Sequence, residues 1–156
     1  MIKMVKSFQG ERAPSNSQTV EQNNLVSHYM TTKLVSFKSD DSMDDVMNKL
    51  VKNKISGGPV VNEKNELIGV ISEGDCLKEI VARTYHNAPR NNGKVSDHMT
   101  CNVATVDAHT DIFEAANKFL SMRLRRFPVL ENGKLIGQIS QKDVMKAVLK
   151  MKSSTW

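Results

Sequence analysis

Residues 67–75 have the sequence LIGVISEGD, which recurs at residues 135–143 as LIGQISQKD. Each copy begins with a short apolar run typical of a buried strand and changes at a serine to a polar, helix-forming sequence. An aspartate follows three residues after that serine in both copies. A strand-to-helix junction that occurs twice indicates that the chain contains two copies of one small structural unit.

The repeat extends outward from this stretch over most of the chain. Residues 26–60 align with residues 95–129 at a constant offset of 69, and one residue is then dropped in the turn before Leu135. Fifteen identities keep the same order in the two copies with this single gap. Shared composition does not produce such an order, so we infer an internal duplication.

The duplication divides the chain into segments. Repeat 1 covers residues 25–82, a linker covers residues 83–94, and repeat 2 covers residues 95–150. Residues 1–24 are polar and have no apolar period, which predicts a flexible N-terminal tail, and residues 151–156 form a short C-terminal tail.

Each repeat carries the signals of a strand, a helix, two further strands and a closing helix. Residues 34–37 and 103–106 are β-type runs that predict the first strands. Residues 43–51 and 112–120 place apolar side chains at helical spacing on one face. The closing helix of each repeat is expected to begin near the serine of the repeated stretch.

Cap and turn residues support these elements. Ser42 and Asp111 directly precede the two amphipathic segments and are good N-cap residues. The pair Asn132-Gly133 predicts a type I′ hairpin turn between the last two strands of repeat 2, because both turn positions require positive φ.

These elements predict a mixed α/β (α+β) fold built from two β-α-β-β-α units. One unit of about fifty residues is too small to bury a good core alone. Two units that pack face to face about a pseudo-twofold axis would bury the apolar faces of both.

The composition bounds the function. Of the 156 residues, 39% are hydrophobic and 25% are charged, as expected of a packed globular domain. The net charge of +5 is scattered and only 5% of the residues are aromatic, which disfavours nucleic acid as a partner. Two distant cysteines argue against a disulfide framework and a zinc site, and no apolar run is as long as a membrane span. We therefore expect a cytoplasmic protein that does not interact with membranes.

Three motifs, in the same order in both repeats, carry a family resemblance. Val-Ser-x-x-Met-Thr opens each repeat, x-x-Pro-Val follows the first helix, and Leu-Ile-Gly-x-Ile-Ser-x-x-Asp closes the sheet. Together they resemble the cystathionine-β-synthase (CBS) domain, which occurs in tandem as a Bateman module. The resemblance covers both repeats and leaves the N-terminal tail outside.

The resemblance implies a regulatory or sensory module that has no catalytic activity of its own. Such pairs bind adenosine-containing ligands (AMP, ADP, ATP, NAD or S-adenosylmethionine) in clefts between the paired sheets, and they usually form homodimers. An adenine nucleotide is therefore expected as a regulatory ligand. No cofactor or metal is required, and the regulated protein is not identified by the sequence.

The serine and aspartate of the closing motif are the first candidate ligands, at Ser72 and Asp75 and again at Ser140 and Asp143. An ionised carboxylate accepts two hydrogen bonds at once, which suits the two hydroxyls of a ribose. The serine hydroxyl and the free N–H groups at the helix start suit a phosphate. The same spacing is also that of a capping box, in which the acid folds back on its own helix. The family pattern favours ribose binding, and the two roles are compatible.

The segment before each Pro-Val motif is the second candidate. Repeat 1 offers Gly57 and Gly58, whose small size lets a ligand approach the backbone. Repeat 2 offers Arg125 and Arg126, whose guanidinium groups can donate to a phosphate. The alternatives are that the glycines only shape the turn and that the arginines are a solvated face. The resemblance adds further lining residues: Ile55, Ser56, Pro59, Phe127, Pro128 and Ile139.

The first strand of each repeat is the third candidate. By resemblance, Lys33, Val35, Asn102 and Ala104 face the adenine with backbone groups and an apolar wall. Core packing is an equal alternative for Val35 and Ala104.

The two clefts are not expected to be equivalent, because the arginines belong to repeat 2 alone. We expect the cleft of Asp143 to bind the more strongly. It would combine Ile55 and Ser56 of repeat 1 with Arg125 and Arg126 of repeat 2.

Three functions of different classes remain open at this point. The first is adenine-nucleotide sensing by a homodimer that signals through a change of shape. The second is a structural dimerisation or interaction module with empty clefts. The third, which the composition disfavours, is a nucleic-acid-binding protein.

Overall fold

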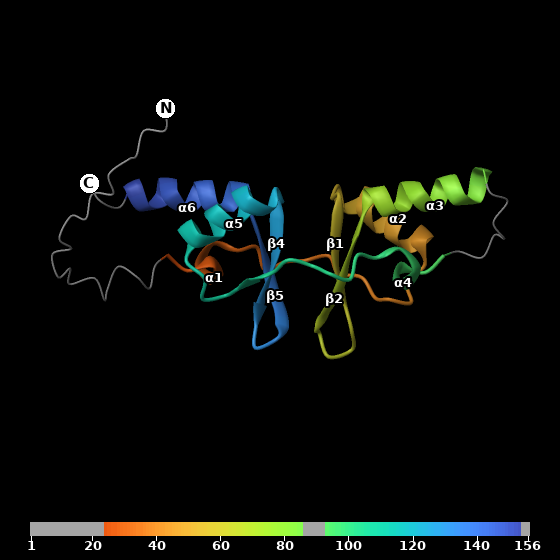
Figure 1. Ribbon diagram of the computed structural model, residues 1–156, viewed down its shortest axis with the longest axis horizontal. Helices are drawn as coiled ribbons and strands as arrows, with labels where there is room; N and C mark the ends of the chain where they lie inside the picture. The colour runs from red at the N-terminus through yellow and green to blue at the C-terminus, as the bar shows by residue number, and fades with distance from the viewer. Residues whose placement is uncertain (1–23, 86–92, 154–156) are drawn as a thin grey trace, which may run out of the picture.

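The computed structural model describes residues 24–85 and 93–153. These residues form two similar halves that lie side by side, each a small sheet with helices packed against it (Figure 1). This architecture confirms the predicted fold class of two paired repeats. The predicted tail over residues 1–24 lies almost entirely outside the described residues, as does most of the linker.

The first half is built from the middle of repeat 1. Helix α2 (Met43–Asn53) leads into the antiparallel strands β1 (Gly57–Val61) and β2 (Leu67–Ser72), and helix α3 (Glu73–Tyr85) follows. The two helices and the sheet enclose one buried cluster: Phe37, Met43, Val46, Leu50, Val60, Ile71, Cys76 and Val95.

The second half repeats this order with one additional short strand. Strand β3 (Val106–Asp107) precedes helix α5 (Ile112–Met122), strands β4 (Arg126–Glu131) and β5 (Lys134–Ser140), and helix α6 (Gln141–Ser153). Strand β4 pairs with β5 in antiparallel and with β3 in parallel orientation. The second core contains Val26, Val106, Ala108, Ile112, Ala115, Phe119, Phe127, Val129, Ile139, Val144 and Ala147.

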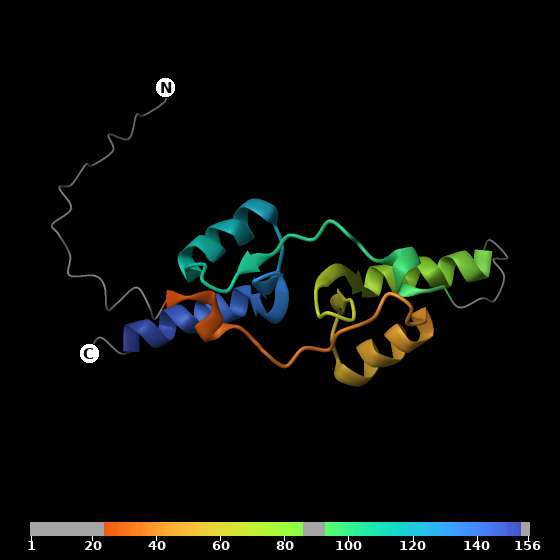
Figure 2. The ribbon, with the colours of Figure 1, turned by 90° about the horizontal axis from the view of Figure 1, so that it is seen from below.

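Two short helices change places between the halves. Helix α1 (Val26–Tyr29) belongs to repeat 1, yet Val26 is fully buried in the second core. Helix α4 (Val95–His98) belongs to repeat 2, yet Val95 is fully buried in the first core. Figure 2 shows the two extended segments that follow these helices and cross between the halves in opposite directions. The repeat that the sequence defines is therefore not the unit that packs.

The repeated Gly and Met-Thr motifs meet at this exchange. Thr31 pairs with Gln138 of β5, with N···O distances of 2.8 and 2.9 Å, and Thr100 pairs with Val70 of β2 at 2.9 Å in both directions. A Cβ atom on Gly137 would lie 2.8 Å from the carbonyl oxygen of Thr31, and one on Gly69 would lie 3.0 Å from that of Thr100. Each glycine thus leaves room for the backbone of the other repeat.

The predicted first strands are wrong over most of their length. In the first half only Phe37 forms a bridge, to Val60, and in the second half the strand is β3, of which the prediction included Val106 alone. The physical reason is the exchange, because residues 32–36 and 101–105 span the gap between the halves. An extended, β-type sequence is used there as a crossing segment.

The predicted helix starts and the hairpin turn are confirmed. The Ser42 side chain accepts a hydrogen bond from the Asp45 amide at 3.1 Å, and Asp111 accepts one from the Phe113 amide at 2.7 Å. Asn132 and Gly133 both have positive φ, as a type I′ turn requires. The closing helices run further than the predicted boundaries, since α3 continues three residues into the linker and α6 continues to Ser153.

Substitution of Gly137 by alanine tests the exchange contact. We expect Gly137→Ala to lower the free energy of unfolding by about 1–3 kcal/mol, because the new methyl group collides with the Thr31 backbone. Gly74→Ala is the matched control. Only the Ser72 hydroxyl lies within 4 Å of its Cβ position on α3, so the change should stabilise by about 0.5–1 kcal/mol. Equal effects of the two substitutions in chemical denaturation would contradict the contact.

Candidate functional site

A cavity of about 380 Å³ lies between the two halves. Its walls come from both sheets, from the segment that crosses after α4, and from the loop before β4. The lining residues are Ser56, Gly57, Gly58, Pro59, Val70, Ser72, Thr100, Asn102, Val103, Ala104, Leu124, Arg125, Arg126, Pro128 and Gln138.

Most of the residues predicted to bind a ligand meet in this cavity. They arrive from three places: the start of β1 with the end of β2, the crossing segment, and the start of β4. These residues are Ser56, Gly57, Gly58, Pro59, Ser72, Asn102, Ala104, Arg125, Arg126 and Pro128. Segments that are distant in the sequence converge here because the exchange brings residues 100–104 against β2.

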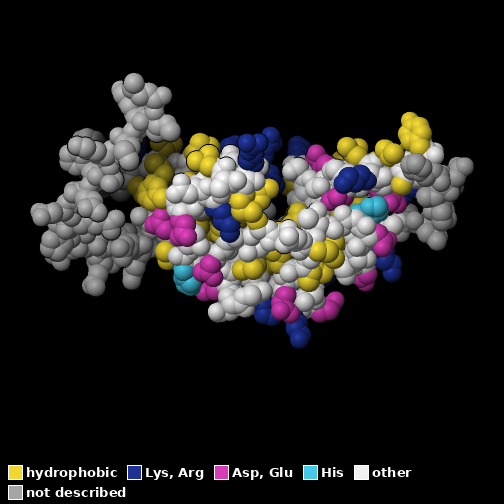
Figure 3. Space-filling view, viewed as in Figure 1, with side chains coloured by type: hydrophobic (Ala, Val, Ile, Leu, Met, Phe, Trp, Pro, Cys, Tyr) yellow, Lys and Arg dark blue, Asp and Glu magenta, His cyan; other side chains and the backbone are white. Residues whose placement is uncertain are grey.

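The charge of the cavity wall is positive. Arg125 and Arg126 are exposed, and the lining residues include no aspartate or glutamate. Lys and Arg side chains gather along the middle of the upper edge of the molecule, above the junction of the halves (Figure 3). Guanidinium groups donate two parallel hydrogen bonds to a phosphate, so this wall suits an anionic group.

The glycine pair of β1 is required by packing within the first half. A Cβ atom on Gly57 would lie 2.7 Å from the carbonyl oxygen of Ile71, and one on Gly58 would lie 2.6 Å from that of Val35. Both glycines border the cavity, but their small size first serves the close approach of neighbouring backbone. The contacts therefore support the alternative in which these glycines serve the local backbone structure.

Both serine-aspartate pairs form helix caps. Oδ2 of Asp75 accepts hydrogen bonds from the amide of Ser72 at 2.9 Å and from its hydroxyl at 3.1 Å. Oδ2 of Asp143 accepts from the Ser140 amide at 2.9 Å, and the Ser140 hydroxyl accepts from the Asp143 amide at 3.2 Å. Asp75 is 8% exposed and does not line the cavity. Ser140 and Asp143 thus form a complete capping box, whereas at Ser72 and Asp75 only the bond from the serine amide to the aspartate is of that kind. Ribose binding by these acids stays a prediction.

The arginines are grouped differently from the prediction. The sequence placed Arg125 and Arg126 with Asp143, Ile55 and Ser56. Both arginines line the cavity with Ser56 and Ser72, and Arg126 also lines an adjoining groove with Ile55, whereas Asp143 lines neither hollow. The crossing segment after α4 causes this arrangement, because it forms a wall on the β2 side of the junction.

Several predicted residues lie elsewhere. Phe127 and Ile139 are fully buried in the second core, and the ring of Phe127 lies 4.4 Å from that of Phe119, so neither is available as a ligand. Val35 packs against the first core, which agrees with the packing alternative. Lys33 is exposed on the other crossing segment and does not line the cavity.

Sequence reasoning missed part of the wall. Val70, Thr100 and Val103 line the cavity together with Leu124 and Gln138. The recurrence of Met-Thr at the start of each repeat was a signal for Thr100. The repeat pattern places Thr100 at the start of its own repeat, because the pattern is the same with or without an exchange between the repeats.

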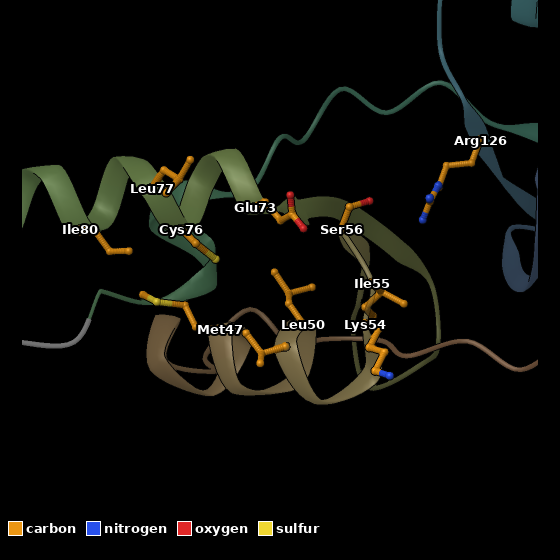
Figure 4. A pocket seen from close by; sticks show the side chains of 11 residues that line it. Met47, Leu50, Lys54, Ile55, Ser56, Glu73, Cys76, Leu77, Ile80 and Arg126 are labelled. Carbon is orange, nitrogen blue, oxygen red and sulfur yellow. The ribbon is translucent and has the colours of Figure 1, made fainter.

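A second, larger groove of about 680 Å³ lies between α2 and α3 (Figure 4). Apolar side chains line most of it: Met47, Leu50, Val51, Ile55, Cys76, Leu77 and Ile80. Burial raises the pKa of the Cys76 thiol, and the nearby Asp75 raises it further. Ser56 and Arg126 line both this groove and the cavity, so the two hollows adjoin.

The described residues show neither a metal site nor a membrane span. No group of three or more His, Cys, Asp or Glu side chains within residues 24–85 and 93–153 could hold a metal ion. No helix in this part of the chain is long and apolar enough to cross a bilayer.

Comparison with known proteins identifies the family. The sequence model of the CBS domain matches residues 26–82 and again residues 95–150. The chain belongs to the CBS domain family. Its two matches in tandem, together with the paired halves of the fold, make it a CBS pair.

Relatives of this CBS pair occur in plants and archaea. The chain is 30% identical to CBSX1, a chloroplastic CBS domain-containing protein of Arabidopsis thaliana, over 83% of this chain and 66% of the relative. It is 29% identical to the uncharacterized protein MJ1426 of Methanocaldococcus jannaschii, over 80% and 91% of the two chains. The crystal structure of CBSX2 in complex with AMP superposes with a TM-score of 0.69 at 32% identity, covering 82% of this chain and 98% of that one.

The chain spans different shares of its relatives. It covers 74% of CBSX2 of Arabidopsis thaliana, but only 42% of the uncharacterized protein MJ1225 of Methanocaldococcus jannaschii. The CBS pair is therefore the part that these proteins have in common.

Proposed function

We propose that this CBS pair senses an adenosine nucleotide, which binds in the cavity beside Ser72. The observation that carries the proposal is the cavity itself, which is lined by apolar side chains and by two arginines, with no acid among its lining residues. The similarity to CBSX2, whose structure was solved in complex with AMP, supports an adenosine nucleotide.

Each part of the cavity suits one part of such a ligand. The apolar wall of Val70, Val103 and Ala104 suits the adenine ring. Arg125 and Arg126 would donate to the phosphate, which is dianionic at neutral pH. The volume of about 380 Å³ lies within the range of small-molecule sites in proteins.

Asp75 is proposed to bind the ribose. The hydrogen bonds of the α3 cap use Oδ2 of Asp75. A carboxylate has acceptor capacity on both oxygens, so we assign Oδ1 to the ribose hydroxyls while Oδ2 keeps the cap. Because Asp75 lies behind Ser72, this contact requires the Ser72 side of the cavity to open.

Occupancy is proposed to act as a signal. The cavity is built from both halves and from a segment that crosses between them, so a bound nucleotide would hold these three parts in one arrangement. We propose a regulatory module without catalytic activity, which needs no cofactor and passes the signal to a regulated protein. A cytoplasmic location remains an expectation, and CBSX1 and CBSX2 are chloroplastic by name.

An interaction module with empty clefts is the second candidate. The observation that favours it is the engagement of both aspartates in helix caps. A ligand that binds only the folded state raises the melting temperature, so the two candidates differ in their response to AMP.

Neutralising the two arginines tests nucleotide binding. We expect AMP to raise the melting temperature of the wild-type chain. The double substitution Arg125→Gln/Arg126→Gln should weaken AMP binding by roughly tenfold or more, because a charge-assisted hydrogen bond contributes about 1.5–3 kcal/mol. Arg123→Gln is the control, since Arg123 lies in the same basic segment but does not line the cavity. Calorimetric titration measures the AMP affinity of the double variant and of the control.

Two outcomes would decide against nucleotide sensing. If the wild-type chain shows no thermal shift with AMP, ADP, ATP or NAD, the module with empty clefts is the better account. If Arg123→Gln lowers the affinity for AMP as much as the double substitution does, general electrostatic attraction and not the cavity determines that affinity.

A homodimer is proposed through the outer helices. Helices α3 and α6 lie along the same edge of the molecule, where hydrophobic side chains are visible (Figure 3). Leu77 and Val81 of α3 are 62% and 47% exposed, and Met145 and Leu149 of α6 are 59% and 66% exposed. Exposed apolar side chains arranged in this way are typical of a surface that a partner covers.

The dimer proposal predicts a dissociating substitution. Leu149→Glu places a charge on the apolar face and should shift the mass in analytical ultracentrifugation from dimer towards monomer. Lys64→Glu, in the turn between β1 and β2 at the edge opposite to α3 and α6 (Figure 1), should leave the mass unchanged. A wild-type chain that sediments as a monomer at all concentrations would contradict the proposal.

A further inference from the structure

We infer that a charged cluster outside the nucleotide cavity positions its wall. The cluster consists of Asp44, Glu79, Arg83 and His98. It holds the exchanged helix α4 against the first half, and through α4 it holds the crossing segment that lines the cavity. The effect on affinity rests on the proposed nucleotide binding, whereas the effect on the crossing segment does not.

The cluster is centred on one buried carboxylate. Glu79 of α3 is 6% exposed. Its Oε1 accepts a hydrogen bond from Nε of Arg83 at 2.8 Å and from the amide of Gly93 at 3.3 Å, and its Oε2 lies 2.6 Å from Nε2 of His98. Nη1 of Arg83 in turn lies 2.9 Å from Oδ1 of Asp44 on α2. Helices α2, α3 and α4 are thus joined through a single set of directional contacts.

The backbone fits closely around this carboxylate. A Cβ atom on Gly93 would lie 2.9 Å from Oε2 of Glu79 and 3.0 Å from Nε2 of His98, so a side chain at this position would displace the carboxylate or the imidazole. Burial alone would raise the pKa of Glu79. The hydrogen bonds from Arg83 and Gly93 and the neighbouring His98 outweigh that effect, and the pKa lies below its usual value. The carboxylate is therefore held in its charged form.

The chain leads directly from this cluster into the cavity. Two residues after His98, Thr100 forms the two backbone hydrogen bonds with Val70. Thr100, Asn102 and Ala104 then line the cavity. The crossing segment has no regular strand of its own, so its position depends on the anchors at its ends.

The other half holds its exchanged helix by different contacts. The positions equivalent to Asp44, Glu79, Arg83 and His98 are Phe113, Ala147, Met151 and Tyr29. Ala147 is fully buried in the second core, and Tyr29 and Met151 pack against it. These four residues carry no charge, so the buried carboxylate and guanidinium of the first half have no counterpart at these positions. Hydrogen bonds to a charged group fix both distance and angle. The directional anchor belongs to the segment whose residues line the cavity.

The experiment compares Glu79→Gln with Met151→Ala in two measurements. Glu79→Gln removes the charge and keeps the shape, and we expect AMP affinity by calorimetry to fall about tenfold, because the wall must then be ordered on binding. Hydrogen exchange at the Thr100 amide should become faster in the chain without nucleotide. Met151→Ala loosens the other exchanged helix, so it should lower the melting temperature but leave AMP affinity within about twofold and Thr100 exchange unchanged.

A milder variant covers the case in which Glu79→Gln does not fold. Asp44 is 48% exposed at the edge of the cluster, so Asp44→Asn releases Arg83 without unpairing the buried carboxylate. Asp44→Asn should lower the AMP affinity measured by calorimetry about threefold.

The outcomes separate this inference from the proposed function. Failure of the wild-type chain to bind AMP would refute the proposed function, and faster Thr100 exchange in Glu79→Gln would still support the anchoring role. Wild-type affinity and wild-type exchange in Glu79→Gln would overturn the inference and leave nucleotide binding intact. Equal loss of affinity in Met151→Ala would also overturn it, since general destabilisation would then explain the effect.

Discussion

The backbone of Thr31 pairs with that of Gln138, and the backbone of Thr100 pairs with that of Val70. These two bridges tie the start of each repeat to the sheet of the other. Neither half has a complete core without the exchange, because Val26 and Val95 are buried across the junction. The same exchange brings a crossing segment to the junction, where it forms one wall of the cavity.

The two halves share one pseudo-symmetric backbone arrangement, and they differ in the side chains at equivalent positions. Gly57 of β1 is equivalent to Arg126 of β4, so a backbone surface on one side of the cavity meets a guanidinium group from the other. The anchors of the exchanged helices differ in the same way, with the charged Glu79 in one half and Ala147 in the other. The described part of this duplicated fold thus carries a positively charged cavity with a directional anchor beside it.

Much of the fold could be predicted from the sequence, because its signals are local. The caps at Ser42 and Asp111 and the Asn132-Gly133 turn are set by neighbouring residues, and all are observed. The apolar period likewise located the amphipathic helices α2 and α5. The exchange could not be predicted, because the repeat pattern is the same whether Thr31 pairs within its own repeat or across to the other.

The site was predicted in part for the same reason. Residue types that suit a nucleotide were recognised, and most of them meet in the cavity. Their grouping differs in part from the prediction, because it depends on which crossing segment lies against which sheet. The roles of Asp75 and Asp143 depend on side-chain conformation, and the sequence pattern for a helix cap is the same as that for a ligand contact. Spacing alone therefore does not separate these two roles.

The pairing of the two threonines can be measured in solution. Nuclear Overhauser spectra of the labelled protein should show backbone contacts from Thr31 to Gln138 and from Thr100 to Val70, as expected across antiparallel bridges. Contacts from Thr31 to Val70 and from Thr100 to Gln138 would mean that each repeat folds on itself. That result would contradict the exchange, and with it the cavity wall and its anchor.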